Sequence, residues 1–268
     1  MTLLRSLLFQ LLSNLWSWAM MILCLPVLLL PRPWVVRVGR LWAGGLHWLL
    51  RWVCGLDHRV RGRENLPDGP CIVASKHQSA WDTIALPVIF PDPCFVLKRE
   101  LLRIPLFGLY LRRAGVVAVD RSGGAKALRR MVADAKTYAA QGRKIVIYPE
   151  GTRSAPGRRT TYHPGVAALY QQLGLPVVPV ALDSGLYWPR RSLLRRPGRI
   201  QVEIRPAIPP GLPRREFMAR LEREIEEPSE ALIAEARRRA QGGPGEDPVQ
   251  DAGEGSGDKP GDIPGNGR

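Results

Sequence analysis

The chain has 268 residues, 45% of them hydrophobic, and a formal net charge of +15. This is enough for one large domain with a proper core and an appendage. The four cysteines form no C-x-x-C pair and show no zinc-ligand spacing with the four histidines, which excludes a metal site of that kind. We therefore expect no metal, and cysteines that are buried and reduced.

The charge is distributed unevenly along the chain. Residues 242–268 carry six acidic and two basic side chains, a net −4, so residues 1–241 carry +19. A body this basic predicts an anionic partner, which is nucleic acid, an anionic membrane or an anionic substrate. The acidic segment is largely Gly, Pro, Asp and Glu, and we expect residues 242–268 to form a disordered tail.

Residues 7–30 contain no charged side chain in 24 positions. As a helix they would be about 36 Å long, enough to cross a bilayer. Gln10, Ser13, Asn14 and Ser17 follow an i, i+3, i+4, i+7 spacing and share one face. Such a polar stripe suits a helix that packs on a partner or lies in the membrane interface as well as one that spans.

A Pro-Arg-Pro break at 31–33 separates this helix from a second apolar segment, residues 34–56. The basic side chains on one face of that segment are Arg37, Arg40, His47 and Arg51. A basic amphipathic helix with tryptophans is typical of a membrane surface. Residues 1–56 are therefore predicted to form a membrane-anchoring helical hairpin; the alternative is a buried hairpin of a soluble domain.

From residue 57 onward, short β-rich runs alternate with helical ones. The predicted strands are 57–61, 71–75, 94–98, 116–120, 144–149, 177–182 and 200–206. The predicted helices are 79–90, 100–113, 124–141, 164–173 and 214–240. This alternation indicates an α/β fold, with a mostly buried mixed sheet flanked by helices in a single domain, residues 57–241.

The stretch KHQSAWDT, residues 76–83, places His77 five positions before Asp82. On one regular helix the two side chains would point about 140° apart. Ser79 is a natural N-cap for a helix that starts here. That start would leave His77 in the preceding loop, free to fold back on Asp82. The alternative is that Asp82 only completes a capping box.

Two further segments carry candidate ligands for an anion. The stretch IYPEGTRS, residues 147–154, ends a predicted strand, and α/β proteins bind ligands at the carboxyl ends of their strands. Arg153 offers a fork of donors suited to a phosphate; the alternative is that it pairs with Glu150 in the turn. Lys98 lies near the predicted start of a helix, which attracts anions.

A third basic segment has five arginines and no acid within ten residues. Its arginines are Arg190, Arg191, Arg195, Arg196 and Arg199. This composition indicates a surface that faces a membrane or binds the phosphates of a donor substrate. A solvated loop is the alternative.

Together these blocks resemble the glycerolipid acyltransferase family, over roughly residues 1–210. The matching motifs are His77-x4-Asp82, F-x2-K-x-E-L-x3-P-x2-G from Phe95, Y-P-E-G-T-R-S at 148–154, and LPVVPVAL at 175–182. The P-E-G-T-R block favours the members that acylate lysophosphatidate over those that acylate glycerol 3-phosphate. His163 departs from the family, which commonly has Lys or Arg there.

The resemblance implies a reaction and a set of roles. An acyl group from acyl-CoA or acyl carrier protein would pass to the sn-2 hydroxyl of lysophosphatidate, without a cofactor or covalent intermediate. His77 would be the general base and Asp82 its orienting carboxylate, since histidine titrates in the right range. The implied substrate-binding residues are Lys98, Glu150, Gly151, Thr152 and Arg153.

The apolar hairpin and the net charge predict the partners and the location of the protein. We expect membrane phospholipids as partners and no nucleic acid, because no recognition motif is present. Arginines beside the apolar segments predict that the catalytic domain lies on the cytoplasmic side, and the resemblance to the bacterial members implies the inner membrane. Two alternatives are another lysolipid acceptor, such as a lyso-ornithine lipid, and a non-catalytic lipid-binding protein.

Overall fold

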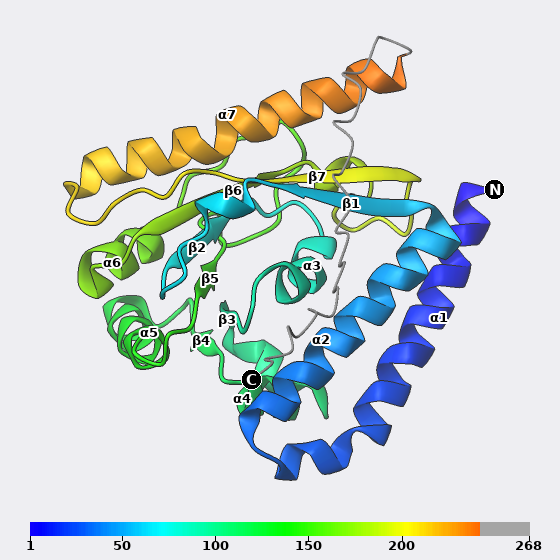
Figure 1. Ribbon diagram of the computed structural model, residues 1–268, viewed down its shortest axis with the longest axis horizontal. Coiled ribbons are helices and arrows are strands. Elements are labelled where there is room, and N and C mark those ends of the chain that lie inside the picture. Colours follow the sequence, from blue (N-terminus) through cyan, green and yellow to red (C-terminus); the bar gives the residue numbers. More distant parts are fainter. Residues whose placement is uncertain (242–268) are drawn as a thin grey trace, which may run out of the picture.

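The computed structural model describes residues 1–241, so the tail predicted for 242–268 lies outside the described residues. An α/β body carries a helical hairpin along one side (Figure 1). The α/β class predicted from the alternation of strands and helices is confirmed.

Seven strands form one mixed sheet in the order β1-β7-β6-β2-β5-β3-β4. They are β1 (Leu56–Arg61), β2 (Ile72–Ser75), β3 (Cys94–Lys98), β4 (Val117–Val119), β5 (Ile145–Ile147), β6 (Val177–Leu182) and β7 (Gly198–Ile204). Neighbouring strands run parallel except β6 and β7. All the predicted strands are present, so the mixed sheet is confirmed.

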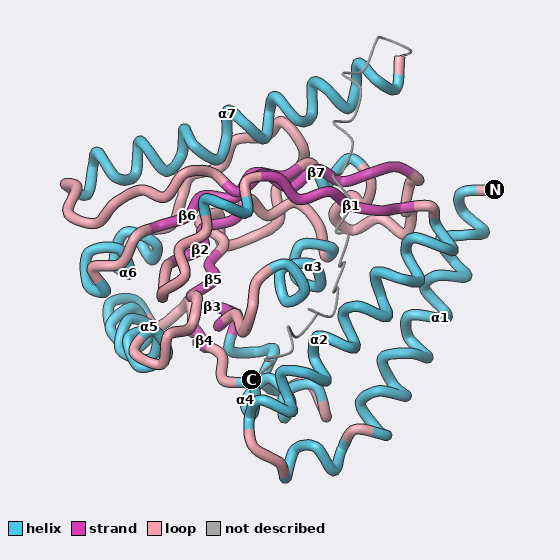
Figure 2. The backbone as a smooth tube through the Cα atoms, viewed as in Figure 1, coloured by secondary structure: helices cyan, strands magenta, loops and turns pink. Residues whose placement is uncertain are grey.

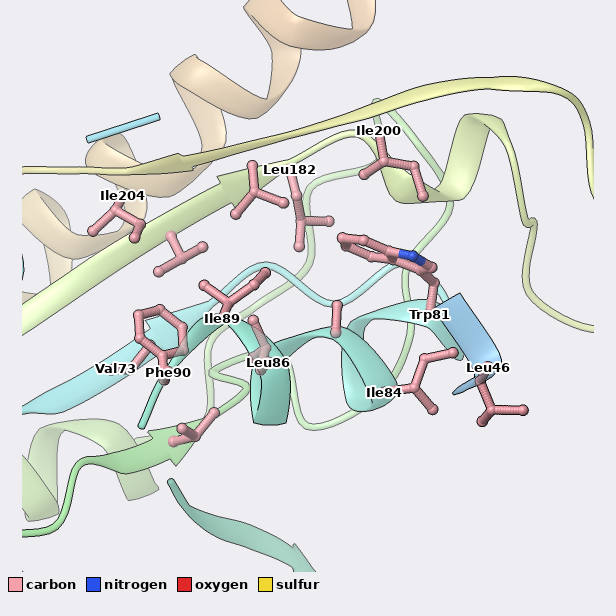
Figure 3. Packing of buried hydrophobic residues seen from close by; sticks show 14 of the residues in the cluster. Leu46, Val73, Trp81, Ile84, Leu86, Ile89, Phe90, Leu182, Ile200 and Ile204 are labelled. Carbon is pink, nitrogen blue, oxygen red and sulfur yellow. The ribbon is translucent and has the colours of Figure 1, made fainter. Parts of the chain in front are cut away.

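Helices cover both faces of this sheet (Figure 2). On one face, α3 (Trp81–Ile89) packs on strands β2, β6 and β7, and Figure 3 shows its Trp81 and Leu86 close to Leu182 and Ile200. On the other face lie α5 (Gly124–Ala139), α6 (Pro164–Leu173) and α7 (Arg214–Ala240). Successive β2 side chains enter the two cores alternately, as the two-residue period of a strand requires.

The helix predicted over 100–113 is wrong as one element. A 3-10 helix, Arg99–Arg103, is followed by α4 (Phe107–Ala114). Pro105 between them has no N–H to continue the ladder, and Leu106 has a φ of +58° that no α-helix contains. The chain therefore turns sharply there, and Gly108 approaches the Leu102 carbonyl so closely that a Cβ would lie 2.2 Å from its oxygen.

The hairpin consists of α1 (Thr2–Leu23), a 3-10 turn (Leu25–Leu29) and α2 (Arg32–Leu49), which ends in a π-helical turn (Leu50–Cys54). The first helix ends at Leu23 and not at the predicted break, because Pro26 opens the 3-10 turn. By length and composition α1 could cross a membrane.

The polar stripe of α1 faces the protein at Gln10, Ser13 and Ser17, whereas Asn14 is exposed. Gln10 accepts a hydrogen bond from the Arg195 guanidinium at 2.6 Å, and the Ser17 hydroxyl accepts one from the Trp42 indole at 3.0 Å. The opposite face of α1 is exposed and apolar. Its exposed side chains are Leu3, Leu4, Leu7, Leu8, Leu11, Leu15, Trp18, Ile22 and Leu23.

Two basic side chains predicted to lie on exposed basic surfaces are covered by the protein instead. Arg195 is 4% exposed, and its guanidinium stacks over Phe9 and Trp188. His47 packs edge-on against Trp81, and burial lowers its pKa to about 4. Both predictions fail because helical periodicity does not reveal which part of a face the rest of the protein covers.

Candidate active site

The structure brings His77 and Asp82 together. His77 lies in the loop after β2, and its Nδ1 is 2.9 Å from Asp82 Oδ2. The helix begins at Trp81 with Ala80 as N-cap, so the N-cap predicted at Ser79 is wrong by one residue. The Ser79 hydroxyl instead accepts a hydrogen bond from the Trp81 N–H at 3.1 Å. The loop His folds back over the first helical turn.

The Asp82 carboxylate is fully buried and well hydrogen-bonded. Its Oδ2 accepts from the backbone N–H groups of Gln78 (2.8 Å) and Ser79 (2.9 Å) as well as from His77. Its Oδ1 accepts from the Ser184 hydroxyl at 2.6 Å. Asp82 thus binds the free N–H groups before α3, and these donors offset the cost of burying its charge.

The imidazole of His77 is held in one orientation. Because Nδ1 donates to the carboxylate, Nε2 is the nitrogen with a free lone pair. The ring stacks on Tyr148, with 4.0 Å between centroids and 19° between planes. Burial keeps the pKa of Tyr148 well above its usual value, so the stacking partner is a neutral phenol. The His77 side chain remains 13% exposed.

An apolar cavity of about 1100 Å³ reaches His77. Its walls come from both hairpin helices, from β3, β4, α4 and α5, and from the loop after β5. Met20 and Val35 line it from the hairpin, and Phe95 and Leu128 from the body. The volume lies above the roughly 300–1,000 Å³ of usual small-ligand sites, so a long apolar group fits beside the imidazole.

The second predicted block follows β5, which lies next to β2 in the sheet. Its Glu150 turns inward, where Oε1 is 2.9 Å from Lys76 Nζ and 3.4 Å from the His77 N–H. Lys76 also donates to both carboxylate oxygens of Glu226 on α7, at 2.8 Å. Glu150 therefore pairs with Lys76 and not with Arg153, and it is absent from the described cavity wall.

The remaining predicted ligands divide between the cavity and the surface. Gly151 lines the cavity with a φ of +63°, and a Cβ there would lie 2.6 Å from the His163 ring. Lys98, half exposed, also lines the cavity. Thr152 is exposed and Arg153 partly buried, and neither belongs to the described cavity wall.

Four side chains of the site were missed in the sequence: Lys76, Tyr148, Ser184 and Glu226. Tyr148 and Ser184 lie at the carboxyl ends of β5 and β6, which flank β2, so their place at the sheet edge was an available signal. Lys76 and Glu226 are 150 positions apart, and no local pattern joins them.

The α/β fold thus places a His–Asp pair beside a long apolar cavity, and the comparison with known families identifies the class of this domain. Residues 57–183, just under half of the chain, match the family model described as Acyltransferase, so this part of the chain is an acyltransferase domain.

Individual relatives support the same assignment. A 1-acyl-sn-glycerol-3-phosphate acyltransferase of Pseudomonas aeruginosa is 41% identical over 167 residues, 62% of this chain and 65% of that protein. A mouse 1-acyl-sn-glycerol-3-phosphate acyltransferase alpha is 31% identical over 162 residues, which are 59% of this chain and 57% of the mouse protein. The chain thus spans just under two thirds of the bacterial relative.

The fold also has a solved counterpart. The crystal structure of the 1-acyl-sn-glycerophosphate acyltransferase from Thermotoga maritima superposes with a TM-score of 0.71. The match covers 87% of this chain and 100% of that one, at 23% sequence identity. At this identity the likeness establishes the fold, which includes the hairpin as well as the sheet.

Proposed function

We propose that this protein transfers an acyl group from an acyl thioester to the sn-2 hydroxyl of 1-acyl-sn-glycerol-3-phosphate, giving phosphatidate. The observation that carries the proposal is the His77–Asp82 pair at the apolar cavity, in a domain of the acyltransferase family. The names of the relatives support the choice of acceptor. Either acyl-CoA or acyl carrier protein would supply the thioester.

The geometry supports a direct transfer. His77 Nε2 takes the proton of the acceptor hydroxyl while the hydroxyl oxygen attacks the thioester carbonyl. Asp82, bonded to Nδ1, stabilises the imidazolium that forms. When the tetrahedral intermediate collapses, the C–S bond breaks and the imidazolium returns its proton to the thiolate. The thioester is already activated, so no covalent enzyme intermediate is needed.

The acceptor's phosphate would be bound by Lys98 and Arg153. Lys98 is on the cavity wall, and its nearest acid, Glu100, is 3.7 Å away and half exposed. Arg153 follows Gly151 in the loop whose start lines the cavity. Glu150 acts differently in this proposal: it fixes the loop by pairing with Lys76. Arg153→Ala and Lys98→Ala should raise KM for the acceptor more than they lower kcat.

The hairpin would hold the cavity against the bilayer. Because one face of α1 is hydrogen-bonded to the protein and the other presents leucines, α1 would lie in one leaflet and not cross it. The exposed arginines of α2, Arg37 and Arg40, suit anionic headgroups on the cytoplasmic face of the inner membrane. An acceptor could then enter the cavity from the leaflet.

The test is thiol release from an acyl thioester by the purified, detergent-solubilised protein, with and without lysophosphatidate. We expect acceptor-dependent release that falls by about 10²–10⁴-fold in His77→Ala and Asp82→Asn, the usual contribution of a general base. Circular dichroism would establish that both variants are folded. Release that survives both substitutions would refute the dyad mechanism.

A panel of acceptors separates the alternatives. Lysophosphatidate should be preferred over lysophosphatidylcholine and a lyso-ornithine lipid. Transfer to a lyso-ornithine lipid alone would keep the chemistry and change the acceptor. Binding of lysolipid without transfer from acyl-CoA or acyl carrier protein would identify a lipid-binding protein instead.

A further inference from the structure

Ser184 is buried beside the dyad, on the side of Asp82 away from His77. Its hydroxyl donates to Asp82 Oδ1 at 2.6 Å, and both side chains are inaccessible to solvent. The two residues are 102 positions apart, so this contact exists only because β6 and β2 are neighbours in the sheet. No other hydrogen bond among residues 1–241 reaches Oδ1.

The two oxygens of the carboxylate are therefore held differently. Oδ2 accepts three donors, from His77, Gln78 and Ser79, all on the loop before α3. Oδ1 is fixed by Ser184, which lies in the 3-10 turn (Ser184–Leu186) that follows β6. Rotation of the carboxylate about its Cβ–Cγ bond would break the Ser184 bond, so this hydroxyl fixes the plane in which Oδ2 meets the imidazole.

The segment that carries Ser184 is itself held in place. The Gly185 N–H donates to the Gln78 side-chain oxygen at 3.0 Å, which joins the β6 end to the catalytic loop. The Asp183 carboxylate accepts from the Gln201 N–H at 2.8 Å, which joins the same end to β7. The hydroxyl is thus presented to Asp82 by a segment with a contact on each side.

We propose that Ser184 is a positioning residue for the acyl transfer, because it fixes the carboxylate that orients His77. This inference rests on the proposed function, and it adds to the His77–Asp82 pair a third member, supplied by the turn after β6. Ser184 touches neither substrate nor the reacting imidazole; its effect passes through Asp82.

The hydroxyl also draws negative charge away from the carboxylate. Without it, Asp82 stabilises the imidazolium form of His77 more strongly and holds the ring less firmly. Ser184→Ala should therefore lower kcat by about tenfold, the size expected for one hydrogen bond to a charged group. It should also move the acid limb of the kcat/KM profile to higher pH.

Two readouts test this. The first is the pH profile of acyl transfer for the wild type and Ser184→Ala. Ser229→Ala is the matched control, because Ser229 is also buried and its hydroxyl has no hydrogen-bond partner in the described part of the chain. The second is the titration of the His77 ring by NMR, assigned with His77→Ala, which needs no substrate. Its midpoint should rise in Ser184→Ala and fall in Asp82→Asn.

A double-substitution cycle separates positioning from a general structural role. If Ser184 acts through Asp82, adding Ser184→Ala to Asp82→Asn should change kcat by less than about twofold. Ser184→Cys keeps the side-chain size with a weaker donor and should fall between wild type and Ser184→Ala. If Ser184→Ala does not fold, Ser184→Cys takes its place in both the pH profile and the titration.

The outcomes are distinguishable. Two results would overturn the inference. One is a His77 titration that Ser184→Ala leaves unchanged. The other is a loss of kcat on adding Ser184→Ala to Asp82→Asn that equals the loss on adding Ser184→Ala to the wild type. A wild type that transfers no acyl group to any acceptor would refute the proposed function, and the NMR titration would then decide the role of Ser184 alone.

Discussion

Lys76 is a buried cation shared by two buried carboxylates, and its removal should be far more damaging than removal of either carboxylate partner. Its Nζ lies 2.9 Å from Glu150 and 2.8 Å from Glu226, and all three side chains are nearly inaccessible to solvent. Tyr162 donates to Glu226 at 2.8 Å. The cluster joins the loop that carries His77, the loop after β5, and α7.

The magnitudes follow from what each substitution leaves behind. Lys76→Met leaves two buried carboxylates without a cation and should lower the free energy of unfolding by at least about 3–5 kcal/mol. Glu226→Gln leaves Lys76 paired with Glu150 and keeps an amide oxygen for the ammonium, so its cost should be about 1–2 kcal/mol. Glu227→Gln on the exposed side of α7 should lie within about 0.5 kcal/mol of wild type.

The assay is equilibrium denaturation followed by circular dichroism in one detergent at constant protein concentration. Lys144→Met is the matched control, since Lys144 is also buried but within residues 1–241 donates only to the Gly69 carbonyl, at 3.4 Å. The deficit of Lys76→Met should shrink at low pH, because the unpaired carboxylates then take up protons. If Lys76→Met cost no more than Lys144→Met, the reasoning from the shared ammonium would be refuted.

Three further predictions concern the hairpin and the site. Burial lowers the pKa of His47 to about 4, against roughly 6.5 in an unfolded chain, so between these pH values the unfolded state binds a proton that the folded state does not. The free energy of unfolding should therefore fall by up to roughly 3 kcal/mol from pH 6.5 to pH 4. In His47→Leu, denaturation curves over this range should lack that component of the pH dependence. Gly151→Ala should reduce kcat/KM, since a Cβ at this position would meet the His163 ring. Gly157 has a similar positive φ with open space around it, so Gly157→Ala should show only the cost of backbone strain. Equal losses of kcat/KM in the two variants would contradict the steric argument. In the acyl-transfer assay, Tyr148→Leu should lower kcat severalfold by removing the ring stacked on the His77 imidazole, while Tyr148→Phe, which keeps that stack, should retain activity.

Much of the fold was predictable because its signals are local. Short apolar runs between helical segments reveal the strands, and the neighbouring residues His77 and Asp82 need only a helix start between them to meet. The break in the predicted helix 100–113 was also readable, because Pro105 stands in its middle.

The rest depends on contacts that no sequence window contains. Ser184 reaches Asp82 only through the pairing of β6 with β2, and Glu226 reaches Lys76 only because α7 packs across the sheet. The burial of Arg195 depends on α1 lying against its loop. Composition identifies such residues as polar or basic and does not tell which of them the protein will enclose.

The pairing of β1 with β7 has a consequence for synthesis of the protein. Leu56 pairs with Gly198, so the first strand made has its partner 142 positions later, and β1 is the edge strand of the described sheet with no other neighbour. At translation rates of 5–20 residues per second, this strand waits on the order of 10 s for β7. The apolar hairpin is complete throughout that interval, so with the proposed membrane attachment the growing chain would reach the bilayer before its sheet closes.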